Sequence, residues 1–166
     1  MNSDYIYRNL TIEDVSDYQT LFFEAIGKDM YFELCRKFGG CTIYFPKEKT
    51  LNSLVYKRLK NGEQERRINT MDKEYLLENL TINDLKEKHK LLFELLGKEE
   101  FIEICITFGG TNITIPQERT LYTNIAKRKI RENKELVQSG VITVQQLAMT
   151  YKVNQSFVYK FLKDEV

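Results

Sequence analysis

An internal repeat constrains the fold more than any other feature of this sequence. Residues 4–60 align with residues 74–130 at a constant offset of 70 and without a gap. Identical segments include NLTI at 9–12 and 79–82, FGG at 38–40 and 108–110, TL at 50–51 and 120–121, and KR at 57–58 and 127–128. A repeat of this length indicates that one supersecondary unit is used twice.

Each copy is expected to contain two helices followed by one strand. In copy one, Thr11 can cap a helix that carries acidic residues in its first turn and ends at Gly27. Thr81 and Gly97 occupy the same positions in copy two. A second helix, over about residues 28–37 in copy one, has apolar side chains at helical spacing and ends at a Gly-Gly pair.

Short β-branched and aromatic runs follow the Gly-Gly pairs and predict one strand in each copy. These strands comprise Thr42, Ile43, Tyr44 and Phe45 in copy one, and Asn112, Ile113, Thr114 and Ile115 in copy two. Because a lone strand leaves backbone donors and acceptors unpaired along both edges, each strand needs a partner. We expect the two to pair within the chain, as an intrachain counterpart of a homodimer; the alternative is that each pairs with another chain, which would make the protein a homodimer or larger oligomer.

The expected fold class is mainly α, with two tandem helix-helix-strand repeats that form a small two-stranded antiparallel ribbon, followed by a C-terminal helix-turn-helix. The predicted domains are a first repeat at residues 1–60, a polar linker at 61–73, a second repeat at 74–118, and a basic helix with the helix-turn-helix at 119–166. Because the two copies continue into different sequences, we expect them to do different jobs.

Composition excludes several classes of protein. With 42% apolar and 30% charged residues, the chain can build hydrophobic cores but has no apolar run long enough to span a bilayer. Its first residues lack the pattern of a secretory signal, so a cytoplasmic location and no membrane partner are expected. Three cysteines without CxxC spacing and one histidine suggest neither a disulfide framework nor a metal site. With no phosphate loop, nucleophile elbow or paired-histidine motif, we expect no cofactor and no enzymatic activity.

Charge is unevenly distributed along the chain although the formal net charge is only +1. Residues 119–163 carry 9 basic and 2 acidic side chains, whereas residues 69–118 carry 5 basic and 10 acidic ones. A concentration of basic residues of this kind is typical of a surface that binds a phosphate backbone.

The same basic segment contains a helix-turn-helix pattern at residues 144–163, in which two helices cross over a short turn. Thr143 can cap the first helix and Asn154 the second. Lys152 holds the turn position that is usually glycine, and a left-handed conformation there would cost about 1 kcal/mol. The predicted buried seam consists of Leu147, Ala148, Tyr151, Val153, Val158 and Phe161.

This pattern predicts which side chains would meet double-stranded DNA. The second helix would enter the major groove, and the candidate base contacts are Gln155, Ser156, Tyr159 and Lys160. The candidate contacts to the DNA backbone are Thr143, Gln145, Gln146, Lys152, Lys163, Lys127, Arg128 and Arg131. Glutamine can bond both atoms of an adenine edge, and lysine can meet phosphate or guanine.

These motifs resemble the Mor transcription activators of phages and mobile elements. The resemblance rests on GGCTIYFPK in copy one, GGTNITIPQ in copy two and QLAMTYKVNQSFVYKFL near the end, and it covers residues 74–164 and, less completely, copy one. It implies a homodimerisation domain, a two-fold DNA site and contact with RNA polymerase or another protein. Three features depart from the family pattern: Lys152 stands in place of glycine, Thr114 in place of the strand tyrosine, and the dimerisation unit is duplicated.

The sequence therefore predicts a sequence-specific DNA-binding transcriptional regulator of phage or mobile-element type. The alternative is a protein-binding inhibitor or co-regulator that acts through the acidic surfaces of the repeats. In that alternative the helix-turn-helix serves only autoregulation or is vestigial.

Overall fold

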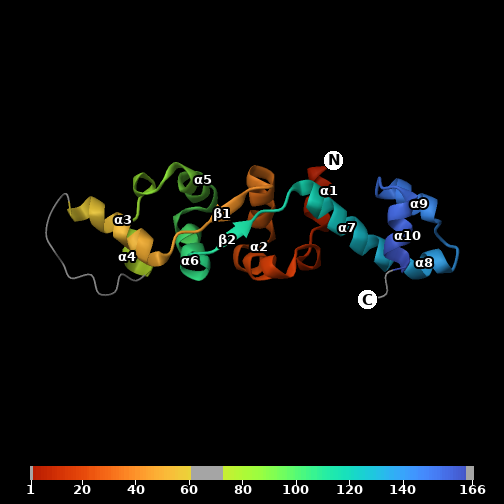
Figure 1. Ribbon diagram of the computed structural model, residues 1–166. Helices are drawn as coiled ribbons and strands as arrows, with labels where there is room; N and C mark the ends of the chain where they lie inside the picture. Colours follow the sequence, from red (N-terminus) through yellow and green to blue (C-terminus); the bar gives the residue numbers. More distant parts are fainter. Residues whose placement is uncertain (1, 61–72, 164–166) are drawn as a thin grey trace. The chain divides into compact units, whose positions relative to one another are not determined.

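The computed structural model describes residues 2–60 and 73–163, which are mainly helical (Figure 1). The elements are α1 (Ser3–Asn9), η1 (Ile12–Asp14), α2 (Asp17–Phe38), β1 (Thr42–Tyr44), α3 (Glu48–Lys60), α4 (Lys73–Asn79), η2 (Ile82–Asp84), α5 (Glu87–Leu96), α6 (Lys98–Phe108), β2 (Asn112–Thr114), α7 (Glu118–Glu132), α8 (Lys134–Gln138), α9 (Val144–Thr150) and α10 (Gln155–Lys163). Most of the predicted linker lies outside the described residues. In the described part of the chain, no helix combines the length and the apolar character that crossing a bilayer would require.

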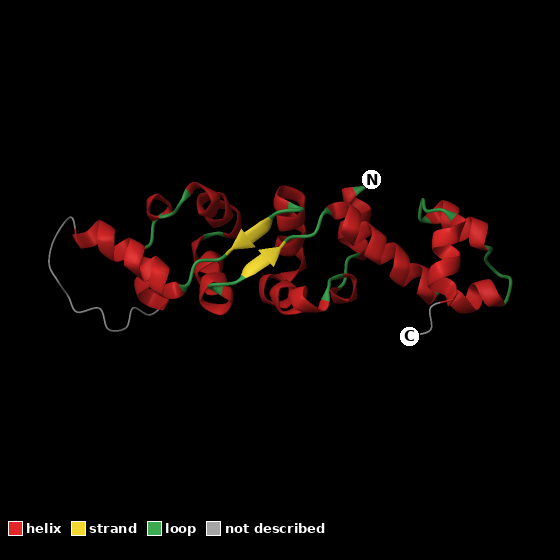
Figure 2. Cartoon of the chain, in the orientation of Figure 1, coloured by secondary structure: helices red, strands yellow, loops and turns green. Residues whose placement is uncertain are grey.

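The prediction of a mainly α protein with a small two-stranded antiparallel sheet is confirmed (Figure 2). The register of this sheet pairs Thr42 with Thr114, Ile43 with Ile113, and Tyr44 with Asn112. Ile43 and Ile113 are equivalent positions of the two copies, so the sheet is centred on a pair of equivalent residues. Phe45 N–H donates to Thr111 O at 3.2 Å and Ile115 N–H donates to Cys41 O at 2.9 Å, which extends the pairing beyond the strand ends.

The prediction of one continuous helix from Thr11 to Gly27 was wrong. Thr11 instead caps the short 3₁₀ helix η1, where the Asp14 carboxylate accepts hydrogen bonds from both the backbone N–H and the hydroxyl of Thr11. The backbone is then extended at Val15, and α2 begins at Asp17. Copy two repeats this geometry at η2. The helix break at Gly27 is confirmed, because its φ of 74° lies in the left-handed region.

In copy two the backbone of residues 46–47 passes so close to the Gly-Gly pair that a side chain would not fit at Gly109. A Cβ atom on Gly109 would lie 2.1 Å from Cys105 O and 2.8 Å from the Cα of Lys47, so any larger residue would clash. Gly110 has a φ of 89°, which L residues rarely adopt. The pair therefore ends α6 and leaves room for the chain segment between β1 and α3.

The described residues divide into two compact units that differ from the sequential domains that were expected. Unit 1 comprises Met1–Gly40 and Pro116–Val166, and unit 2 comprises Cys41–Ile115. In unit 1, α7 of copy two packs on α1 and η1 of copy one. In unit 2, α3 of copy one packs on α4, η2 and α6 of copy two. Each unit thus combines the N-terminal helices of one copy with the post-strand helix of the other.

In both units an equivalent arginine–aspartate ion pair joins the helix after the strand to the 3₁₀ helix of the other copy. In unit 1, Arg128 Nε of α7 lies 3.0 Å from the Asp14 carboxylate of η1, and the guanidinium also donates to Asn9 O. In unit 2, Arg58 Nε of α3 lies 2.7 Å from Asp84, and its guanidinium donates to Asn79 O. These residues are equivalent at the offset of 70, which explains why the KR pair recurs in the repeat.

The three cysteines are free thiols. Cys35 and Cys105 are buried, and burial raises the pKa of both thiols to about 12. Cys41 is exposed. The described residues contain no cluster of three or more histidine, cysteine, aspartate or glutamate side chains that could hold a metal ion.

A disulfide across the sheet would test whether the strands pair within one chain. The Thr42 and Thr114 hydroxyls share a hydrogen bond of 3.0 Å, and antiparallel partners lie close enough for a disulfide. In a Cys41→Ser background, T42C/T114C is expected to oxidise to a covalently closed monomer. Non-reducing electrophoresis and light scattering would measure this, and a disulfide-linked dimer would instead show that the strands pair between chains. Cys35 and Cys105 would not interfere, since their thiols stay protonated at neutral pH.

Candidate nucleic-acid interface

The last two helices, α9 and α10, have N-caps at both of the residues that the sequence predicted. The Thr143 hydroxyl accepts from the Gln146 N–H at 3.2 Å, and the Gln146 side chain accepts from the Thr143 N–H at 2.8 Å, which completes a capping box. Asn154 Oδ1 accepts from the Phe157 N–H at 2.7 Å at the start of α10. Both short helices therefore have fixed first turns.

The turn between α9 and α10 contains Lys152 in a left-handed conformation, with φ of 47°. Among the described residues it is the only non-glycine residue with a positive φ. The turn closes through hydrogen bonds from the Lys152 N–H to Met149 O and from the Val153 N–H to Ala148 O. The cost of about 1 kcal/mol for this conformation is offset by the packing that the turn makes possible.

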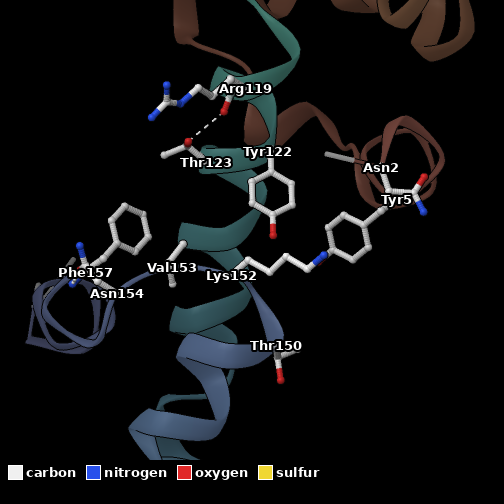
Figure 3. A pocket seen from close by; sticks show the side chains of 10 residues that line it. All are labelled: Asn2, Tyr5, Arg119, Tyr122, Thr123, Thr150, Lys152, Val153, Asn154 and Phe157. Atoms are coloured by element: carbon white, nitrogen blue, oxygen red, sulfur yellow. Dashed lines mark hydrogen bonds between the residues drawn. The ribbon is translucent and has the colours of Figure 1, made fainter.

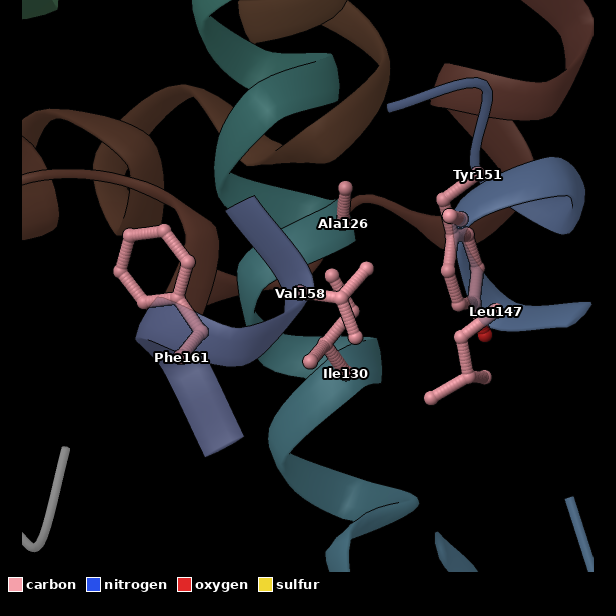
Figure 4. Close-up of a cluster of buried hydrophobic side chains, with 7 residues drawn as sticks. Ala126, Ile130, Leu147, Tyr151, Val158 and Phe161 are labelled. Carbon is pink, nitrogen blue, oxygen red and sulfur yellow. The ribbon is translucent and has the colours of Figure 1, made fainter. Parts of the chain in front are cut away.

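A hydrophobic core holds the helix pair on α7 (Figure 4). Its buried residues are Ala126 and Ile130 from α7, and Leu147, Ala148, Tyr151, Val158 and Phe161 from the α9–α10 segment. Every residue of the predicted seam is buried except Val153, which is partly buried and packs against the same core. The Tyr122 hydroxyl of α7 donates to Tyr151 O at 2.6 Å and ties α7 to the end of α9.

The opposite side of α10 is open to solvent. Gln155, Ser156, Tyr159, Lys160 and Lys163 are all exposed. The Tyr159 ring is among the exposed large side chains of this unit, with half of the residue's surface accessible. No hydrogen bond joins the Gln155, Ser156 or Tyr159 side chain to another residue in the described part of the chain, so these groups are free to meet a ligand.

The candidate backbone contacts fall into two groups. Thr143, Gln145 and Lys152 are exposed around α9 and the turn. Gln146 is also exposed, but its side chain is used by the capping box at Thr143, so its first role is to fix the start of α9. Lys127 Nζ and the Arg131 guanidinium each lie 5.4 Å from the centre of the Phe161 ring, which places both cations beside α10.

Arg128 has a structural role instead of the predicted contact to DNA. Its side chain is only 16% exposed and bonds to the buried Asp14 carboxylate, to Asn9 O and to Glu132. The hydrogen bond that Arg128 donates to Asp14, followed by the one it donates to Glu132, raises the pKa of the Arg128 guanidinium. No local sequence signal indicates this role, because both residues of the KR pair are typical of a charged surface.

Glu132, one of the two acidic residues in the basic segment 119–163, forms ion pairs with two neighbours. Glu132 accepts from Lys129 Nζ at 2.8 Å and from Arg128 Nη1 at 2.7 Å. The bond from Lys129, with that from Arg128, holds the pKa of the Glu132 carboxyl below its usual value. These contacts fix the Glu132 side chain on α7 beside Arg128 and Lys129.

Comparison of the chain with protein-family models, with curated proteins and with solved structures found no match.

Proposed function

We propose that this protein is a sequence-specific regulator of transcription that binds double-stranded DNA with α9 and α10 as a helix-turn-helix. The observation that carries the proposal is the two-sided character of α10. Val158 and Phe161 pack into the core with α7, whereas Gln155, Ser156 and Tyr159 face solvent without internal partners. A short helix held rigidly by one face, with hydrogen-bonding side chains on the other, fits the major groove.

The chemistry of the exposed groups suits both parts of DNA recognition. Gln155 can bond the edge of adenine through its amide, and Ser156 can donate to or accept from several base edges. Lys152, Lys160 and Lys163 supply positive charge at the turn and along α10. Cations at these positions would hold phosphates and fix the register of the helix on the duplex.

One chain would carry one DNA-reading head. On α7, Ala126 and Ile130 form the apolar seat for α9 and α10, but the equivalent positions on α3 are Tyr56 and Lys60. A lysine at the centre of this seat cannot pack against an apolar helix pair. This difference supports a Mor-like regulator in which copy one has kept the dimerisation-type unit without the DNA-binding end, so that a two-fold site would need two chains.

A protein-binding regulator is the second candidate, because an apolar side chain is exposed at the same position in both copies. Leu21 on α2 is 69% exposed and its equivalent Leu91 on α5 is 57% exposed, with Tyr18 beside Leu21 at 71%. Glu24 and Glu94 follow these leucines three residues later. Exposed apolar groups beside acidic ones suit a protein partner such as RNA polymerase.

Gel-shift experiments with fragments of the source genome would test the DNA-binding proposal. We expect shifted fragments whose affinity falls steeply with salt, since several cations would displace counterions from the duplex. Q155A/Y159A is expected to lose about tenfold or more of the preference for the selected site while weak non-specific binding remains. Met149→Ala is the matched control, because Met149 is exposed on α9 and lies outside the proposed contacts. The absence of any shift at low salt would contradict the proposal.

A further inference from the structure

A cleft of about 860 Å³ lies in unit 1, between α1, the first turns of α7 and the turn that leads into α10 (Figure 3). Its volume is within the range of about 300–1,000 Å³ that is usual for small-molecule sites. Three aromatic side chains line it, Tyr5 from α1, Tyr122 from α7 and Phe157 from α10. The cleft is therefore bounded by three separate helices.

The Tyr5 and Tyr122 rings form an aromatic wall of the cleft, and contacts outside the cleft fix their positions. The Tyr5 and Tyr122 rings lie 5.8 Å apart at an angle of 56°. Tyr122 is fixed by its hydrogen bond to Tyr151 O, and burial is the main cause that raises the pKa of the Tyr5 and Tyr122 hydroxyls. Both rings are thus ordered and partly shielded from water, as a platform for a planar ligand would be.

The charge of the cleft is positive and uncompensated. Arg119 and Lys152 are among its ten lining residues, and none of the ten is acidic. Neither cation forms an ion pair with another described residue, whereas Arg36, Arg58 and Arg128 all do. In a chain with nearly equal numbers of basic and acidic residues, two free cations beside an aromatic wall favour an anion that carries a planar ring.

From this combination we infer that the cleft binds a free mononucleotide, whose base contacts the tyrosine rings beside Lys152 and whose phosphate is held by Arg119. The remaining lining residues include amide and hydroxyl groups, such as Asn2, that suit the edges of a base or the hydroxyls of a sugar.

The bound nucleotide would act on the proposed DNA-reading helix, and this part of the inference rests on the proposed function. Lys152 and Phe157 belong to the turn before α10 and to its first turn. A ligand that holds these residues against α1 and α7 restricts the motion of α10 where it begins. Nucleotide binding would therefore change the affinity for DNA through the position of α10.

Calorimetry on the full chain without DNA tests the binding site itself. AMP is expected to bind saturably, whereas adenosine, which lacks the phosphate, and inorganic phosphate, which lacks the ring, should each bind at least tenfold more weakly. Arg119→Gln should weaken AMP binding about tenfold, because it removes one charged hydrogen bond from an exposed residue that the fold does not need. Arg8→Gln is the matched control: Arg8 is an exposed cation on α1, outside the cleft, and its loss should leave AMP binding unchanged.

Two outcomes would overturn the inference. One is the absence of saturable AMP binding, or equal binding by the wild type and Arg119→Gln. The other is tighter binding of a 5′-phosphorylated single-stranded hexanucleotide with the same dependence on Arg119, which would assign the cleft to the end of a nucleic acid instead of a free nucleotide. Gel shifts with the same preparation separate this inference from the proposed function, because DNA binding without AMP binding refutes only the cleft, and AMP binding without DNA binding refutes only the regulator.

Discussion

Replacing Arg128 with methionine is expected to lower the free energy of unfolding of unit 1 by about 3–5 kcal/mol, because the substitution leaves a buried carboxylate without its cation. The Asp14 side chain has no exposed surface, and Arg128 supplies it with hydrogen bonds of 3.0 Å from Nε and from Nη2. The total stability of a domain is typically about 5–15 kcal/mol, so a loss of this size would bring unit 1 close to unfolding at room temperature.

Hydrogen exchange of the α1 and α7 amides would measure this effect, because it separates unit 1 from unit 2 within the same chain. Arg58→Met is the matched control in unit 2. The two carboxylates are similarly buried, but Arg58 is 40% exposed where Arg128 is 16% exposed, so water already screens more of the Arg58 charge and we expect a smaller loss. In the Arg128→Met background, Asp14→Asn should restore part of the stability, since it removes the unpaired charge. If Asp14→Asn restored nothing, the loss would come from packing and not from the ion pair.

Replacing Val158 with aspartate is expected to unfold α9 and α10 and to abolish the proposed DNA binding. Val158 is completely buried among Ala126, Ile130 and Leu147, where a carboxylate would find no cation or hydrogen-bond donor to replace water. The cost exceeds what the helix pair can absorb, because α9 has 7 residues and α10 has 9, and isolated helices of this length are unstable in water. Unit 2 should remain folded.

Circular dichroism and gel shifts would follow the two consequences separately. Met149→Asp introduces the same charge on α9 at a position that is 71% exposed, and its stability should stay within about 0.5 kcal/mol of the wild type. Val158→Ala should give an intermediate loss, since it only removes two methyl groups from the core. If Val158→Asp lost the helical signal of α9 and α10 yet kept its affinity for DNA, the proposed reading helix would be wrong.

Local signals in the sequence predicted the elements around the candidate site. Thr143 and Asn154 were identified as N-caps because a hydroxyl or amide side chain at these positions satisfies backbone N–H groups of the next turn. The buried side of α10 followed from apolar residues at helical spacing, and Lys152 was recognised as a residue that a left-handed turn would strain. Each of these features depends on residues within a few positions of one another.

Other features could not be read from local sequence. The local sequence predicts Thr11 as the cap of a long helix, but Asp14 closes a short 3₁₀ turn at Thr11, and the next helix starts independently at Asp17. The cleft beside α10 was also missed, because Tyr5, Arg119 and Lys152 are far apart in the chain and meet only when α1, α7 and the turn pack together.

The sequence by itself determined that one helical unit is used twice and that a basic, amphipathic helix pair follows only the second copy. Tertiary structure decided that the helix after the strand in each copy packs on the N-terminal helices of the other copy. Both copies carry the same arginine, aspartate and asparagine, so Arg128 could satisfy Asp84 as well as Asp14 by chemistry alone. The choice is made by the chain path, because α2 ends in unit 1 while β1 and α3 belong to unit 2, and β2 leads back from unit 2 to α7 in unit 1. This exchange turned Arg128 from an expected DNA contact into the residue that fastens α7, the helix on which α9 and α10 are packed.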